Sequence, residues 1–198
     1  ALRKQFGRRA GTALGGGAYA NNTNATATGV NSRATGVNAT ANGAYSNAAG
    51  DNSSAFGAGA QALGTGDQAL GFGSYAAGAL NTAVGYQANA VGLGNSSSGT
   101  GATAAGIANS AFGSYATALG VANSVSGTGA YAAGYGNSAF GTGARAVGTV
   151  NTAVGFASYA VSPGATAVGA GATATYSNAT ALGTNTGAFN EGSVAIGT

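Results

Sequence analysis

The chain has 198 residues, of which 39 are Gly, one is Pro and only 5% are charged, and it contains no Cys, His, Met or Trp. This composition is unusual for a globular domain, and the lack of Cys and His excludes disulfides, thiol chemistry, nucleophile–histidine pairs and ordinary zinc sites. The formal net charge is +3, but four of the six positive side chains lie within residues 1–10. The rest of the chain has two Arg against three acidic residues, so we expect no nucleic-acid-binding surface.

The first ten residues, ALRKQFGRRA, differ from everything that follows and are interpreted as a basic N-terminal arm or cap. No apolar core follows the basic residues as a signal peptide would require. No later run approaches the ~20 apolar residues of a membrane helix, so we expect no membrane span in this chain.

A seven-residue repeat begins at residue 11 and continues to residue 198, which we interpret as a single domain. Stepping by seven from Gly15 to Gly197 reaches 27 positions, and 23 of them are Gly. The residue two before each of these positions is Ala in 25 cases, the exceptions being Ser97 and Val125. Columns this strict argue against a disordered, low-complexity segment.

The repeat predicts short strands rather than a coiled coil. A Gly at every seventh position would cost a helix roughly 1 kcal/mol each relative to Ala, and the seam would lack large side chains. Within each unit, small residues instead alternate with bulkier ones, which is the period of a β-strand. We expect each strand to end in a Gly-containing turn.

Alternate units differ, so the true period is 14 residues. In one class the residue three before the Gly is a small hydroxyl, such as Ser110, and the residue just before the Gly is large and apolar, such as Phe112. The other class has Tyr, Arg or amide side chains three before its Gly. Two strands per 14 residues predict a narrow parallel β-solenoid of about 13 coils, in which Ala points inward. The apolar column then points outward and requires burial against neighbouring chains.

A column of Asn recurs at consecutive 14-residue steps within this pattern. Stacked Asn side chains can hydrogen-bond along the ladder and to the backbone of the turns. We therefore interpret the column as structural rather than as a row of ligand-binding groups. Its members are Asn81, Asn95, Asn109, Asn123, Asn137 and Asn151.

The phrases GSVAIG at residues 192–197 and NSAFG at residues 109–113 and 137–141 resemble the head repeats of trimeric autotransporter adhesins, the YadA-like heads of Gram-negative bacteria. The resemblance covers residues 11–198 and implies a left-handed parallel β-roll that forms a parallel homotrimer. It places Val194 and Ile196 in the trimer interior and, by phase, the whole apolar column. The expected trimer-interface residues are Phe56, Leu70, Val84, Phe112, Phe140, Val154, Val168, Leu182, Val194 and Ile196. Polar residues interrupt the column at Thr28, Asn42, Ser98 and Ser126.

The resemblance also implies a surface-displayed adhesin head that binds extracellular-matrix proteins of the collagen, fibronectin or laminin type, or other host or abiotic surfaces. By this resemblance we expect a head displayed at the bacterial surface, on an outer-membrane-anchored protein. The family's neck, stalk and outer-membrane anchor are not in this sequence. Tyr offers amphipathic contact area at low entropic cost, which makes the polar outward column the candidate ligand-contact face. That column includes Tyr19, Arg33, Tyr75, Tyr131, Arg145 and Tyr159.

Two other functions stay open at this point. One is a structural fibre subunit whose solenoids stack end to end. The other is ice binding, although Thr26/Thr28 and Thr173/Thr175 are the only Thr-x-Thr strand pairs and they belong to opposite classes.

Catalysis is not expected, and neither is a cofactor or a metal. Asp51 and Asp67 lie 16 residues apart, about one coil, and could approach each other, but two carboxylates are too few oxygen ligands for a metal site. The many Gly-x-Gly sequences precede no helix and carry no phosphate-binding signal.

Overall fold

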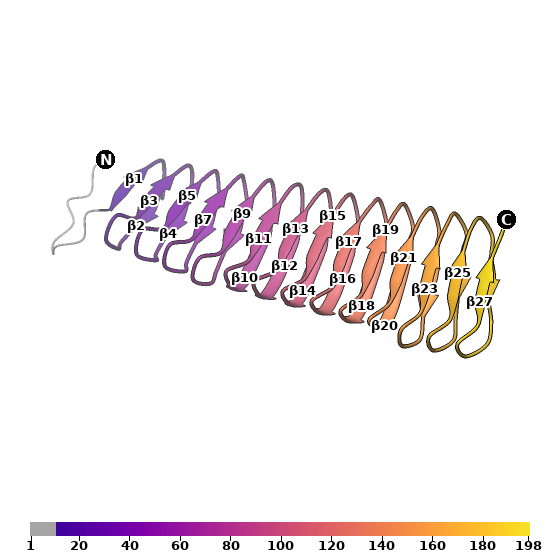
Figure 1. The fold of residues 1–198 in the computed structure, drawn as a ribbon. Helices are drawn as coiled ribbons and strands as arrows, with labels where there is room; N and C mark the ends of the chain where they lie inside the picture. Colours follow the sequence, from indigo (N-terminus) through magenta and orange to yellow (C-terminus); the bar gives the residue numbers. More distant parts are fainter. Residues whose placement is uncertain (1–10) are drawn as a thin grey trace. The chain divides into compact units, whose positions relative to one another are not determined.

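The computed structural model describes residues 11–198, which form 27 β-strands and no helix (Figure 1). The chain divides into two compact units, the first ending at Leu93 and the second beginning at Gly94. In each unit the odd-numbered strands form one parallel sheet, sheet A, and the even-numbered strands form a second, sheet B. The predicted solenoid of about 13 coils, each with 14 residues and two short strands, is therefore confirmed. The basic arm predicted over residues 1–10 lies outside the described residues.

In the first unit, strand partners lie 14 residues apart, as in the pairing of Ala41 with Ala55. The strands of sheet A are β1 (Thr12–Leu14), β3 (Thr26–Thr28), β5 (Thr40–Asn42), β7 (Ser54–Phe56), β9 (Gln68–Leu70) and β11 (Thr82–Val84). Those of sheet B are β2 (Tyr19–Ala20), β4 (Arg33–Ala34), β6 (Asn47–Ala48), β8 (Gln61–Ala62), β10 (Tyr75–Ala79) and β12 (Asn89–Leu93).

The second unit keeps the same register, as in the pairing of Ala118 with Ala132. Its sheet A strands are β13 (Ser96–Ser98), β15 (Ser110–Phe112), β17 (Ser124–Ser126), β19 (Ser138–Phe140), β21 (Thr152–Val154), β23 (Thr166–Val168), β25 (Thr180–Leu182) and β27 (Val194–Ile196). Its sheet B strands are β14 (Thr103–Ile107), β16 (Thr117–Val121), β18 (Tyr131–Tyr135), β20 (Arg145–Thr149), β22 (Tyr159–Val161), β24 (Thr173–Ala174) and β26 (Gly187–Ala188).

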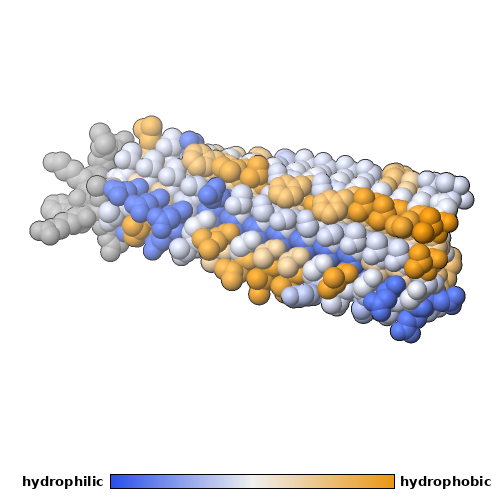
Figure 2. Space-filling model, in the orientation of Figure 1, coloured by the Kyte–Doolittle hydropathy of each residue, from blue (hydrophilic) through white to orange (hydrophobic). Residues whose placement is uncertain are grey.

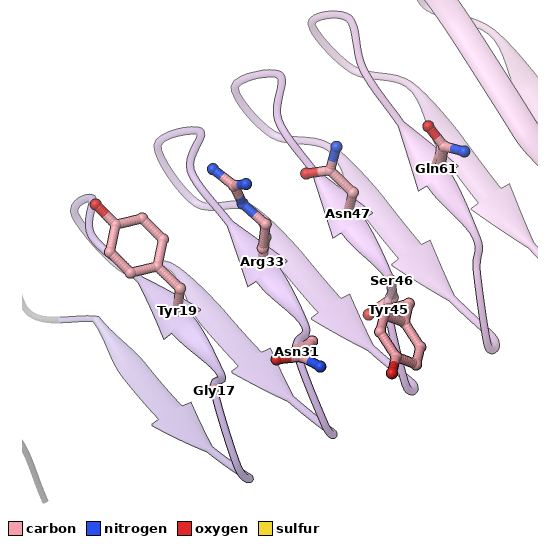
Figure 3. Close-up of a pocket in the computed structure, with 8 residues that line it drawn as sticks. All are labelled: Gly17, Tyr19, Asn31, Arg33, Tyr45, Ser46, Asn47 and Gln61. Atoms are coloured by element: carbon pink, nitrogen blue, oxygen red, sulfur yellow. The ribbon is translucent and has the colours of Figure 1, made fainter.

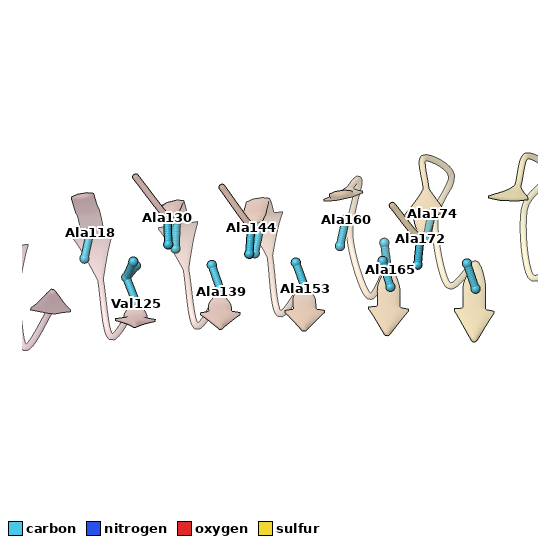
Figure 4. Close-up of a cluster of buried hydrophobic side chains, with 14 of the residues drawn as sticks. Ala118, Val125, Ala130, Ala139, Ala144, Ala153, Ala160, Ala165, Ala172 and Ala174 are labelled. Carbon is cyan, nitrogen blue, oxygen red and sulfur yellow. The ribbon is translucent and has the colours of Figure 1, made fainter. Parts of the chain in front are cut away.

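The core of each unit consists almost entirely of alanine. The second residue of nearly every strand points inward, and so does the residue just before the strand, because side chains alternate between the two faces of a sheet. Figure 4 shows Ala118 of β16 and Val125 of β17 pointing toward each other's sheet in the second unit. The two sheets lie close enough that a methyl group fills most interior positions, and buried Ser, Asn and Asp side chains occupy others.

The two exceptions in the alanine column lie near each other in the second unit. Ser97 and Val125 both pair with Ala111, one from each side, and both are fully buried. The Ser97 hydroxyl has no hydrogen-bond partner among residues 11–198. A buried hydroxyl without a partner loses its bonds to water and gains none in return, so this position opposes folding.

Replacing Ser97 with Ala is therefore expected to raise the free energy of unfolding by about 1–2 kcal/mol. The midpoint of urea or thermal unfolding measures this effect. Ser158 is the matched control, because its buried hydroxyl donates to the Gly155 carbonyl at 3.1 Å. Ser158→Ala should lower the midpoint, and a lower midpoint for Ser97→Ala as well would show that its hydroxyl is satisfied in solution.

The predicted Asn ladder is present, and its side chains are buried inside the solenoid. In the second unit the Asn109 carboxamide donates to Asn95 Oδ1 at 3.0 Å, and Asn109 Oδ1 accepts from the Asn123 backbone and side chain at 3.0 Å each. In the first unit Asp67 occupies the same column and accepts from both nitrogens of Asn81. In the second unit the side-chain oxygens of Asn95, Asn109, Asn123 and Asn137 thus each accept from the Asn of the next coil.

These Asn residues also determine the length of the preceding strand. Asn109 Nδ2 donates to the carbonyls of Ala105, at the centre of β14, and of Gly120, next to the last residue of β16, which ties together the C-terminal halves of two neighbouring strands. The strands of sheet B that precede an Asn of the ladder all have five residues, whereas the other strands of sheet B have two or three. The five-residue strands are β10, β12, β14, β16, β18 and β20.

Candidate interaction surfaces

The outer face of sheet A carries two parallel columns of side chains, one hydroxylated and one mostly apolar. In the second unit, Phe140 of β19 pairs with Val154 of β21, and the apolar column continues through Val168 to Leu182 and Ile196. Phe112 is 47% exposed and Phe140 is 39% exposed, so the single chain leaves these rings in solvent. On the face seen in Figure 2, apolar side chains gather in rows that follow the stacking of the coils.

All ten residues predicted for the trimer interface lie on this outer face of sheet A. Nine occupy the apolar column, and Val194 lies in the neighbouring hydroxyl column, where it pairs with Thr180. The polar interruptions fall where the sequence predicts: Ser126 pairs with both Phe112 and Phe140. In the first unit, Asn42 separates Thr28 from Phe56.

The outer face of sheet B carries the predicted tyrosines and arginines, and the structure brings most of them together. In the second unit, the Arg145 guanidinium lies 5.3 Å from the centre of the Tyr131 ring and 5.7 Å from that of Tyr159. In the first unit, Arg33 lies 5.9 Å from the centre of the Tyr19 ring. Each contact contributes roughly 0.5–1 kcal/mol at an exposed site and holds the guanidinium in place.

Unlike the other predicted contact tyrosines, Tyr75 does not lie against an arginine. It pairs with Gln61 of β8 on one side and with Asn89 of β12 on the other. The first unit therefore presents a row that runs from an aromatic–cation pair through amide side chains to a second tyrosine.

A shallow groove of about 640 Å³ lies over this row in the first unit (Figure 3). Strands β2, β4, β6 and β8 each contribute one outward side chain to it. The turns that lead into β2, β4 and β6 contribute the rest. The lining residues are Gly17, Tyr19, Asn31, Arg33, Tyr45, Ser46, Asn47 and Gln61.

The turn residues of this groove, above all Tyr45, were not predicted as contact residues. Tyr45 lies two residues after Gly43, outside the strand columns on which the sequence-based prediction rests, and its side chain is exposed. A usable signal exists: Asn31 and Tyr115 occupy the same turn position and also have positive φ, at 55° and 57°. This turn position, two residues after the repeat Gly, recurs every 14 residues, and including it in the pattern would have indicated Tyr45.

Another aromatic pair occurs at the turns after β9 and β11. The rings of Phe72 and Tyr86 stack with centroids 5.5 Å apart and an interplanar angle of 8°. The Phe72 side chain is 57% exposed and the Tyr86 side chain is 50% exposed, and the sequence-based prediction included neither.

The two neighbouring acidic residues have separate structural partners. Asp51 accepts from the Val37 backbone N–H at 2.8 Å, and the buried Asp67 carboxylate accepts from the Gly64 N–H at 2.8 Å as well as from Asn81. Within residues 11–198, no three Asp, Glu, His or Cys side chains come together. No helix in that range is long and apolar enough to cross a membrane.

The chain matches one family model, described as the YadA head domain repeat, over residues 10–32, 34–60, 97–121 and 177–198. A comparison with curated proteins gave no significant match. The matched segments include Tyr19, Tyr45 and Asn47 of the groove, whereas Arg33 and Gln61 fall just outside them.

Proposed function

The chain contains YadA head domain repeats, and from this we propose that residues 11–198 form the head of a trimeric adhesin displayed at the bacterial surface. In this proposal three copies pack in parallel with sheet A inward and sheet B outward. The outward surface binds extracellular-matrix proteins, of the collagen, fibronectin or laminin type, or other host or abiotic surfaces.

The apolar column on sheet A, which is uninterrupted from Phe140 to Ile196, carries the proposal. A core made of alanine buries little surface per residue, so a single chain gains little hydrophobic free energy to offset the ordering of so many glycines. Phe112 and Phe140 are 47% and 39% exposed in the single chain, so other chains can remove from water a little under half of the roughly 150–250 Å² that an aromatic side chain can bury. The column from Phe140 to Ile196 therefore supplies what the core lacks, provided that other chains cover it.

The opposite face suits adhesion because its side chains repeat along the solenoid. Tyr and Arg are the residue types that dominate binding energy at protein surfaces. Three copies of each contact on one particle raise the overall affinity through effective concentration, so each contact need only be weak.

Substituting Glu for Phe140 is expected to reduce the assembly from three chains to one. The change removes about 2–3 kcal/mol of apolar burial per chain and brings three carboxylates together near the axis. Light scattering or sedimentation equilibrium on the full chain measures the mass. The control is Tyr135→Glu, which introduces the same charge at an exposed aromatic residue of β18 and should leave the trimer mass unchanged.

The measured mass and a binding panel together decide between the possible functions. A wild-type mass of one chain would contradict the trimer, and a mass much larger than three chains would favour a fibre subunit. A panel of immobilised matrix proteins tests adhesion, and an intact trimer that binds none of them would contradict the matrix-binding role.

A further inference from the structure

The groove over β2, β4, β6 and β8 contains several polar groups with no partner in the protein. The side chains of Asn31, Asn47 and Gln61 make no hydrogen bond with other residues in the range 11–198. They line the wall of the groove around Arg33, and Figure 3 shows the side chains of Tyr19, Arg33, Asn47 and Gln61 in one row. The groove thus presents donors and acceptors that only water or a ligand can satisfy.

Arg33 is a positive charge without a counter-ion in the described chain. In the range 11–93 the acidic residues are Asp51 and Asp67, and both use their carboxylates on backbone and Asn nitrogens. The guanidinium lies 5.9 Å from the centre of the Tyr19 ring, which favours this position and leaves its N–H donors free. A guanidinium is suited to bidentate binding of a carboxylate.

The remaining lining indicates a sugar rather than a bare anion. Carboxamides both donate and accept hydrogen bonds, so Asn31, Asn47 and Gln61 match the hydroxyl groups of a sugar ring. Tyr19 and Tyr45 add amphipathic rings that can contact its C–H faces. Neighbouring coils lie about 4.8 Å apart, so amides from successive strands reach successive parts of one ring.

We propose that this groove binds a sugar residue that carries a carboxylate, with Arg33 on the carboxylate and the amides on the hydroxyls. The volume of about 640 Å³ is within the range of small-molecule sites. The proposal deepens the adhesin function, because it identifies the ligand class of one patch on the proposed contact face. The groove is open, so we expect weak binding per site and strong binding only when several sites act together.

Ligand-observed and protein-observed NMR titration of the full chain tests this directly. The probes are methyl β-glucuronide and sialyllactose, each compared with its neutral counterpart, methyl β-glucoside or lactose, and with inorganic sulfate. We expect both acidic sugars to bind at least tenfold more tightly than the neutral ones and than sulfate. Equal binding of neutral sugars, or of sulfate alone, would overturn the proposal.

The variants localise the site. Arg33→Gln should weaken binding of the acidic sugars at least tenfold, and Asn47→Ala should weaken it a few-fold. Arg145→Gln is the matched control: Arg145 also lies against tyrosine rings, but in the second unit, with no share in the groove. An equal loss in Arg145→Gln would contradict the assigned site. These side chains are on the surface, so we expect the variants to have the unfolding midpoint of the wild type. An unchanged midpoint confirms that a variant folds. A trimer that binds matrix proteins but no acidic sugar would overturn this inference alone and leave the adhesin function standing.

Discussion

Replacing Gly127 with Ala is expected to lower the free energy of unfolding by more than about 3 kcal/mol, which is a large part of the stability of an ordinary domain. Gly127 has a φ of 139°, which L side chains rarely adopt. A Cβ there would lie 2.5 Å from the carbonyl oxygen of Gly141 in the next coil and 2.6 Å from its carbon. Because these neighbours are backbone atoms, no side-chain movement relieves the clash. Urea unfolding followed by circular dichroism measures the loss.

Gly129 provides a matched control two residues further along the same turn. Its φ of 64° lies in the left-handed region, and a Cβ there would meet nothing within 4 Å. Gly129→Ala should therefore cost only about 1 kcal/mol, the penalty for placing alanine in that conformation. Similar losses in the two variants would show that turn conformation alone, and not the close stacking of coils, selects glycine at position 127.

The contrast between these two glycines shows what the sequence could predict about the fold. The glycine column and the alternation around it predicted short strands, tight turns and a 14-residue coil, because each of these depends on local conformation. The distance between coils is a tertiary property, so the local pattern does not indicate that a Cβ at position 127 would meet the backbone of Gly141. Handedness and the number of chains depend on twist and on partner chains, and for these the family resemblance was needed.

The candidate surfaces were predictable to a similar extent. The strand columns placed Tyr131, Arg145 and Tyr159 on one face, and the structure shows them in contact. The groove was not predictable, because it needs Tyr45 from a turn in addition to side chains from the strands. The alternation of side chains along a strand predicts which face of the sheet each strand residue is on. It does not predict how far the side chain of a turn residue reaches over the neighbouring sheet.

The Asn ladder also illustrates how one residue type can have a larger effect than its polarity suggests. Asn123 donates to Asn109 Oδ1 at 3.0 Å, to the Leu119 carbonyl at 2.8 Å and to the Gly134 carbonyl at 2.9 Å. Its own Oδ1 accepts from the backbone and side chain of Asn137. Both coils next to it therefore depend on one buried carboxamide.

Replacing Asn123 with Ala is expected to cost about 3–5 kcal/mol, because several buried groups lose a partner at once and each costs about 1–3 kcal/mol. Chemical unfolding measures the total. Hydrogen exchange of amides at the ends of β16 and β18 should show faster exchange there than in β24, which lies beyond the ladder.

Asn38→Gly separates this burial effect from the loss of an amide as such. Asn38 also belongs to a 14-residue Asn row, in which it accepts from Asn24 and donates to Asn52 at 3.0 Å each, but this row is exposed. Glycine suits its φ of 55°, so the change removes only hydrogen bonds that water replaces, and a loss below about 1 kcal/mol is expected. If Asn123→Ala cost no more than Asn38→Gly, water would be entering the solenoid at position 123, and the ladder would not be the element that holds the five-residue strands of sheet B in place.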